Sequence, residues 1–170
     1  MEKVGVKLLE KISSYQFLNN LIPGALFCVL LPFLTRYDLM GENVWFNLVI
    51  VYFCGIVISR FGSIVIENIL KWIHAVKFEP YHNYLEASEK DPFIKTLSME
   101  NNMYRTFISL FVLLFLAKLS DYIASKWAFW DENISWILCV LLLALCIGAY
   151  IKQTHFIVER IKKQIKSNEK

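Results

Sequence analysis

The stretch VWFNLVIVYFCGIVISRFGSIVIE, residues 44–67, joins an uninterrupted apolar run to an arginine and a carboxylate on one continuing helical pattern. At 1.5 Å per residue from Val44, Arg60 lies roughly 24 Å along the helix, near the edge of a hydrocarbon core about 30 Å thick. Beyond Arg60, apolar residues keep helical spacing with polar residues between them, as far as Pro80. The pattern predicts a membrane-spanning helix that projects several turns beyond the bilayer.

The composition of the whole chain is that of a membrane protein. Of the 170 residues, 56% are hydrophobic and 15% aromatic, and the mean hydropathy is +0.45, too apolar for an ordinary soluble domain. Each of four apolar runs is long enough to span a bilayer once its flanking residues are added. These runs are residues 17–34, 44–58, 107–124 and 134–151. We therefore expect an all-α, four-pass transmembrane protein.

The four spans divide the chain into regions. The first run follows an amphipathic segment, and no small-residue cleavage site comes after it, so we expect it to remain as a span. The predicted regions are an amphipathic segment (1–16), spans one and two (17–62), a cytoplasmic helical region (63–103), spans three and four (104–151) and a basic tail helix (152–170). The four cysteines, Cys28, Cys54, Cys139 and Cys146, lie inside the runs without a Cys-x-x-Cys motif, and we expect them to be buried small residues.

Basic residues predict the orientation. Of the 18 Lys and Arg residues, all except Arg36, Lys118 and Lys126 precede span one, lie between spans two and three, or follow span four. Because Lys and Arg concentrate in cytoplasmic loops, this bias predicts that both termini and the central loop lie in the cytoplasm.

Span one carries polar and helix-breaking residues. Asn19 and Asn20 lie one turn before Pro23 and Gly24. Proline removes a backbone hydrogen bond, so a kink or a break is expected near Asn19. These four residues are candidates for a polar path through the membrane or for a helix interface. The alternative is that the asparagines are simply solvated at the headgroups.

Further helical pieces are expected outside the bilayer. One is predicted at residues 81–90, and another begins at Asp91 and Pro92, an N-cap residue followed by a proline suited to the first turn. The tail spaces Thr154, Val158, Ile161 and Ile165 like a short coiled-coil seam. Together with the end of helix two, these pieces predict a compact bundle that copies of the chain complete.

Small and charged residues define a candidate gate or clasp. Small residues on helix two, Gly55, Ser59, Gly62 and Ser63, would let another helix approach closely. An unpaired carboxylate at the membrane boundary is costly, so we expect Glu67 to pair with Arg60 or with Arg105. The clasp or gate would comprise Ser59, Arg60, Glu67, Asn102 and Arg105.

The tail carries a basic stripe of Arg160, Lys162, Lys163 and Lys166. Such stripes bind anionic headgroups or enforce topology, and in an oligomer this stripe could bind a phosphate-rich ligand. Only Phe156 lies near it in the sequence, so base stacking is not indicated.

No enzyme motif is present in the sequence. His74, His82 and His155 have no ligand spacing, and there is no nucleophile elbow and no Gly-rich phosphate loop. We therefore expect no catalytic residue, metal site or cofactor.

Three segments, YQFLNNLIPG, YFCGIVISRFGSIVIE and NNMYRT, resemble a group of small four-pass bacterial membrane proteins that share a Pro-Gly first span, an S-R-x-G-S-x-x-x-E segment and an N-x-Y-R-T segment. The resemblance extends to about Leu119. Proteins of this size are similar to membrane effectors of anti-phage defence, with the Hailong effector and the Kiwa membrane component as the first comparisons. The signature positions carried over are Ser59, Arg60, Gly62, Ser63, Glu67, Asn102, Tyr104 and Arg105.

This resemblance implies a homo-oligomeric, tetrameric ion channel or pore-type effector. Its implied partners are the lipid bilayer, its own copies, and a nucleotide or DNA oligomer signal with its synthase or another cytoplasmic defence protein. The alternative is a non-conducting membrane scaffold or adaptor that recruits a cytoplasmic partner.

Overall fold

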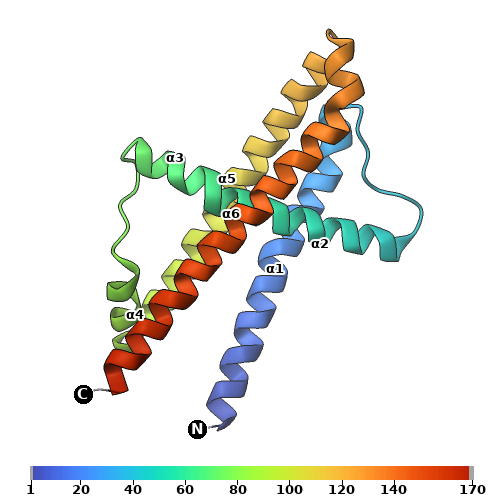
Figure 1. The fold of residues 1–170 in the computed structure, drawn as a ribbon. Coiled ribbons are helices and arrows are strands. Elements are labelled where there is room, and N and C mark those ends of the chain that lie inside the picture. Colours follow the sequence, from blue (N-terminus) through green and yellow to red (C-terminus); the bar gives the residue numbers. More distant parts are fainter. Residues whose placement is uncertain (1, 169–170) are drawn as a thin grey trace.

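The computed structural model describes residues 2–168 as five continuous helical stretches, and this part of the chain contains no strand. In chain order they are α1 (Glu2–Leu34), a long helix made of α2 (Val44–Phe61), a π-helical turn (Gly62–Ile66) and α3 (Glu67–Trp72), then α4 (Tyr81–Lys90), α5 (Phe93–Ala124) and α6 (Ala128–Asn168) (Figure 1). The expected all-α class is confirmed.

Three of these helices are long and apolar enough to cross a membrane: Val44–Trp72, Phe93–Ala124 and Ala128–Ile165. The apolar part of α1, Asn19–Leu34, is shorter. A span needs about 17 to 25 residues, so α1 reaches across only with the help of its flanking residues.

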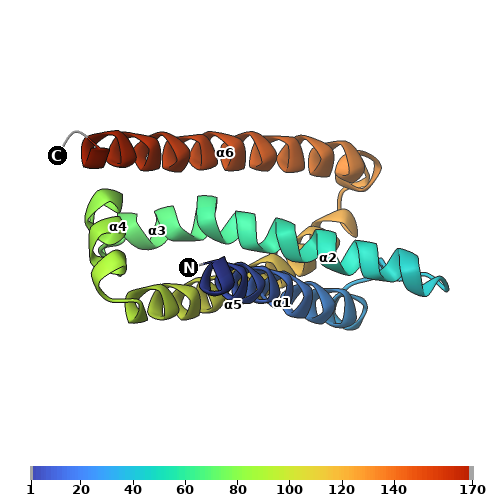
Figure 2. The ribbon, with the colours of Figure 1, turned by 90° about the horizontal axis from the view of Figure 1, so that it is seen from below.

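The long central helix lies between the other helices. In Figure 2, α2 and α3 lie between α6 on one side and α1 with α5 on the other, and Figure 1 shows them crossing α5 and α6 obliquely. A small buried core of Leu31, Ile58, Leu110 and Leu114 joins α1, α2 and α5. By contrast, α6 contributes no buried side chain among its described residues. Its long apolar surface is therefore available to lipid or to another protein chain.

Helix α1 runs without interruption through Pro23 and Pro32. The predicted break near Asn19 is therefore wrong. Membrane helices tolerate proline where a neighbouring helix covers the freed backbone groups. Next to Pro23, α1 and α2 pack in backbone contact at Gly24 and Gly55.

The long helix continues past Arg60, as predicted, but it ends at Trp72, so the predicted end at Pro80 is wrong. His74 adopts a left-handed backbone conformation with φ of 60°. The N–H of Ala75 then bonds the carbonyl of Leu70, and that of His74 bonds the carbonyl of Lys71. This Schellman-type arrangement satisfies the last carbonyls and stops the helix.

The predicted helix at residues 81–90 is confirmed, and the piece predicted from Asp91 is the start of α5, which is continuous with span three. Helix α4 occupies Tyr81–Lys90, and α5 begins at Phe93, whose N–H bonds the Asp91 carboxylate at 2.9 Å. Helix α4 packs on α5 and α6. The end of α3 instead points away from α4 (Figure 1), and Trp72 is 80% exposed. Helix α4 and the adjoining parts of α5 and α6 therefore pack together without the end of helix two.

The cysteines do not share one environment. Cys28 is buried and Cys54 is half-buried, whereas Cys139 and Cys146 are exposed on α6. The expectation of four buried cysteines is therefore wrong for α6, because no helix of the same chain covers these positions.

Candidate functional site

The most concentrated chemistry in the described residues surrounds Glu67, whose side chain is only 9% exposed. Its carboxylate contacts Lys71 Nζ at 2.8 Å, Arg105 Nη1 at 2.6 Å and Lys152 Nζ at 3.0 Å. These four residues, which we call the Glu67 cluster, come from α3, α5 and α6. One carboxylate thus ties three helices together.

The π-helical turn Gly62–Ile66 sets up this arrangement. A π-helical turn changes the hydrogen-bond register and often marks a functional site. The Lys152 ammonium donates to the Ser63 carbonyl at 2.7 Å as well as to Glu67, and the Asn68 amide donates to the Ile64 carbonyl at 2.7 Å. Lys152 therefore holds α6 against both the turn and the carboxylate that follows it.

Glycine makes the approach of α5 to this turn possible. A Cβ at Gly62 would collide with the Ser109 hydroxyl, which donates to the Arg105 carbonyl at 2.7 Å. Because Gly62 has no side chain, α5 lies close enough to this turn for Arg105 to reach Glu67. This use of Gly62, and the contact of Gly55 with α1, agree with the close approach expected from small residues on helix two.

The cluster holds more positive than negative charge. Three cations surround one carboxylate, and Arg105 and Lys152 are only 19% and 26% exposed. A half-buried cation is stabilised by a nearby opposite charge, and removing that charge from a buried group is strongly destabilising. Glu67 is therefore the residue on which the electrostatics of all three cations depend.

The pairing of Glu67 with Arg105 is one of the two expected from the sequence, and the structure contains it. Arg60 forms no ion pair among the described residues and is exposed. Asn102 lies one turn before the cluster, where its carbonyl accepts a bond from Thr106. Ser59 is half-buried on α2, and neither it nor Asn102 contacts Glu67 through an observed hydrogen bond.

Two members of the Glu67 cluster were missed from the sequence. Lys71 lies four residues after Glu67, and this helical spacing could have revealed it. Lys152 comes from a span 85 residues away, and no local pattern indicates that it turns toward helix two.

The polar residues of span one lie where α1 crosses α2. Pro23 and Gly24 are buried there, and a Cβ at Gly24 would collide with the Val51 carbonyl. Pro23 and Gly24 therefore do not line a polar path in the single chain, because α2 occupies the space beside them. Asn19 and Asn20 are half-buried, and Asn19 Oδ1 has no hydrogen-bond partner among the described residues.

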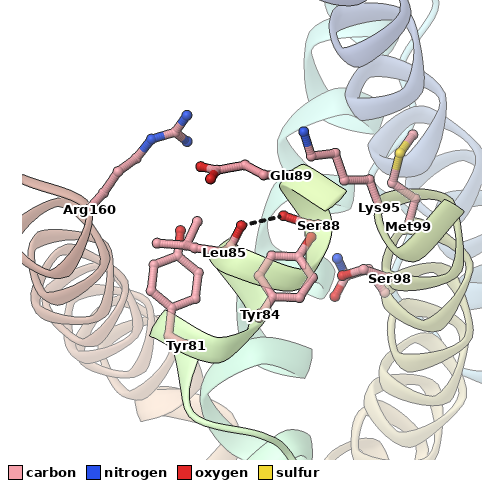
Figure 3. A pocket seen from close by; sticks show the side chains of 10 residues that line it. Tyr81, Tyr84, Leu85, Ser88, Glu89, Lys95, Ser98, Met99 and Arg160 are labelled. Atoms are coloured by element: carbon pink, nitrogen blue, oxygen red, sulfur yellow. Dashed lines mark hydrogen bonds between the residues drawn. The ribbon is translucent and has the colours of Figure 1, made fainter. Parts of the chain in front are cut away.

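A second polar region lies between α4, the start of α5 and the end of α6, where a cavity of about 390 Å³ is present (Figure 3). Tyr81 packs at 4.8 Å from the Phe156 ring and 6.0 Å from the Tyr84 ring, measured between ring centroids. The aromatic surfaces that the tail lacks in the sequence are thus supplied by α4. Sequence reasoning missed them because they lie about 80 residues before the stripe, and local periodicity does not report contacts between distant segments.

Two residues of the basic stripe pair with acidic neighbours. Lys162 pairs with Glu159 at 3.1 Å, and Lys163 pairs with Glu89 at 2.9 Å. Arg160 lines the cavity, and the side chain of Lys166 lies outside the described part. On exposed α4, a hydrogen bond from Lys90 lowers the pKa of the Glu86 carboxyl and in turn raises the pKa of Lys90.

Another charge cluster lies at the opposite end of the helices and was not expected from the sequence. Arg36, in the loop between α1 and α2, pairs with Asp121 of α5 at 3.1 Å and with Asp131 of α6. We call these three residues the Arg36 cluster. Nearby, the Trp130 indole donates to the Ser120 hydroxyl at 3.1 Å and fastens the hairpin between α5 and α6.

The histidines do not form a site. The described residues contain no group of three or more His, Cys, Asp or Glu side chains that could hold a metal ion. Compared with protein-family models, curated proteins and solved structures, the chain gives no match. Its function is therefore inferred from the geometry of its own residues.

Proposed function

We propose that the protein is a homo-oligomeric channel or pore-type effector of the bacterial inner membrane, gated through the helical region formed by α4 and the adjoining ends of α5 and α6. It crosses the membrane four times, with both termini in the cytoplasm. As the sequence resemblance implies, it acts in anti-phage defence in response to a cytoplasmic signal.

The observation that carries the proposal is the Glu67 cluster. Lys152 and Arg105 lie on the helices that continue into the α4 region, whereas Glu67 follows the π-helical turn of the central span. A displacement of α5 or α6 by a ligand would therefore act directly on the ion pairs that hold the central helix. Such a set of contacts is a two-state element that a signal can bias.

The proposed topology is supported by the arrangement of the helix ends. The two chain ends lie at the same end of the molecule as α4, and the α5–α6 hairpin lies at the other (Figure 1). That hairpin carries Trp127 and Trp136, which are 67% and 75% exposed. Exposed tryptophans are typical of the membrane interface.

The proposed oligomer is supported by what the single chain leaves open. Pro23 and Gly24 are covered by α2, so they do not line a path within the single chain. Helix α6 has no buried residue among its described positions, so its surface is available to another copy. We therefore place the ion path between copies. Asn19, whose Oδ1 is buried in the single chain and has no hydrogen-bond partner among the described residues, is the polar residue of α1 that we expect to line this path.

The test is ion release from sealed liposomes that contain the purified protein, with cross-linking to confirm that oligomers are present. We expect wild-type protein and Glu67→Gln to conduct differently, because loss of the carboxylate weakens the hold on the central helix. Asn19→Leu should alter the conductance of whichever form is open, whereas the exposed hairpin variant Lys126→Gln should not. Liposomes that stay as tight as protein-free ones with all four proteins would overturn the proposal.

A second function, a non-conducting scaffold for a cytoplasmic partner, is favoured by the exposed tail seam. Val158, Ile161 and Ile165 are 42%, 54% and 55% exposed on one helix outside the expected bilayer. Recovery of a stoichiometric soluble partner from cells whose membrane stays impermeant, and its loss on Ile161→Ser, would favour the scaffold over the channel.

A further inference from the structure

The cavity between α4, α5 and α6 combines cations, hydroxyls and aromatic rings. Arg160 approaches it from α6, and Lys95 lies across it on α5, with the two tyrosines and Glu89 of α4 between them (Figure 3). Polar atoms of Ser98 and Asn102 also line it. The complete lining is Tyr81, Tyr84, Leu85, Ser88, Glu89, Lys95, Ser98, Met99, Asn102 and Arg160.

The ion pairs of this region leave two positive charges over. The region holds the described lysines and arginines of α4, of α5 up to Arg105, and of α6 from Lys152 onward. All but two of them form an ion pair, and their partners are Glu67, Glu86, Glu89 and Glu159. The exceptions are Lys95 and Arg160, and both line the cavity. Glu89, the one carboxylate in the lining, is neutralised by Lys163 at 2.9 Å. The cavity lining therefore holds two cations that form no ion pair with a described residue.

We propose that this cavity binds the phosphate group of a ligand, with Arg160 and Lys95 as the groups that hold it. Arginine offers a planar fork of donors that matches phosphate oxygens, and lysine adds a compact charge. The Tyr81 and Tyr84 rings give the ligand an apolar wall beside the phosphate. The inference does not depend on ion conduction, because it concerns binding alone.

The position of the cavity relative to the membrane leaves two sources for the phosphate. Asn102 and Lys95 precede Arg105 by three and ten residues on α5, so the cavity lies about 5 to 15 Å beyond the Glu67 cluster along the helix. If the cluster lies at the edge of the hydrocarbon, this is the depth of lipid headgroups, where tyrosine is enriched. The phosphate is therefore that of a phospholipid headgroup or of a soluble phosphate compound that enters from the cytoplasm.

The experiment has one arm for each source. In the first, protein in nanodiscs of mixed phosphatidylglycerol and phosphatidylcholine is released into detergent, and native mass spectrometry counts the phosphatidylglycerol molecules retained per protomer. In the second, inorganic phosphate is titrated calorimetrically into protein in phosphatidylcholine nanodiscs. We expect wild-type protein to give saturable binding in at least one arm, and that arm identifies the source.

The decisive variant is Lys95→Gln/Arg160→Gln, and the matched control is Arg60→Gln/Lys77→Gln. The control removes the same two charges, also exposed and without an ion pair among the described residues, from outside the cavity. Binding should weaken about tenfold or more in the first variant, as expected for loss of hydrogen bonds to a charged group, and stay within about twofold of wild type in the control. No binding in either arm, or equal weakening in both variants, would overturn the proposal. A failure of ion release in liposomes would leave it standing.

Discussion

Two charge clusters of opposite design contact α5 on the two sides of the buried core. In one, a single carboxylate, Glu67, contacts three cations from α3, α5 and α6, and its side chain is 9% exposed. In the other, a single cation, Arg36, contacts Asp121 and Asp131, and its side chain is 47% exposed. Each cluster joins segments that are distant in sequence, so connectivity alone does not distinguish them.

Burial distinguishes them. Arg36 and Asp131 are 47% and 48% exposed, so water screens their charges and competes for their hydrogen bonds, and such a pair adds little to stability. Glu67, Arg105 and Lys152 are 9%, 19% and 26% exposed, so these three charges are shielded from water and depend more strongly on their partners. We therefore expect a small displacement of a helix to cost more free energy at the Glu67 cluster than at the Arg36 cluster.

The largest effect is expected for Glu67→Gln. The substitution keeps the size of the side chain but removes the carboxylate that contacts the half-buried Arg105 and Lys152. We expect a loss of about 3 to 5 kcal/mol in the free energy of unfolding. Denaturation of the purified protein in mixed micelles, followed by circular dichroism, measures it.

A double variant separates charge from packing at this site. Lys152→Met removes one of the cations and keeps an apolar chain of similar length. If charge is the cause, Glu67→Gln/Lys152→Met will lose less than the sum of the two single losses, because fewer cations are left unpaired. Additive losses, or wild-type stability of Glu67→Gln, would refute the role given to the carboxylate.

The next largest effect should come from Gly55→Ala, which tests a contact without charge. An alanine Cβ at this position would collide with the Asn20 carbonyl, a backbone group that cannot rotate away. The helices α1 and α2 must then separate, at a cost of about 1 to 3 kcal/mol in unfolding free energy.

Gly148→Ala is the matched control for this effect, since α6 is the loosely packed helix. Its nearest contact would be Ile64 Cδ1 at 3.4 Å, a flexible side-chain atom. We expect no loss, or a gain of about 0.5 to 1 kcal/mol from better helix propensity. Equal losses at both glycines would show that the α1–α2 crossing is no tighter than the contact of α6.

Gly62→Ala should have a smaller effect than Gly55→Ala, about 1 kcal/mol, because the obstructing Ser109 hydroxyl is a side-chain atom that can turn. The double variant Gly62→Ala/Ser109→Ala should recover part of this loss. Unfolding in mixed micelles reads out both. No recovery would mean that the π-helical turn itself, rather than the contact with α5, requires glycine.

The sequence was sufficient to predict the helices but not their mutual arrangement. Apolar runs, Asp91 before Pro92 and the spacing of the tail predicted α4, α5 and α6 closely, because these signals are local. The end of α3 was placed too late because the apolar spacing continues past Trp72. His74 is the residue that stops the helix, and a left-handed histidine has no strong sequence signal.

The candidate site was predicted only in part, because local signals are visible in the sequence and contacts between distant segments are not. A carboxylate at the end of a span indicates a nearby cation, and Arg105 was one of two sensible choices. Choosing between Arg60 and Arg105 required knowledge of which face of the helix meets α5, and the π-helical turn shifts that face. Lys152 and the tyrosines of α4 come from distant segments, and only the packed structure brings them to their neighbours.

The smallest effect is expected for Arg36→Gln, which tests whether the more exposed Arg36 cluster adds little to stability. Because Arg36 is half exposed, we expect the unfolding midpoint in mixed micelles to stay within the scatter of replicates, and any residual loss to vanish as salt is raised. Glu67→Gln should keep most of its loss at high salt, since its partners are shielded. A salt-independent loss for Arg36→Gln as large as that for Glu67→Gln would mean that the two clusters hold the helices equally, and that burial is not what makes the Glu67 cluster special.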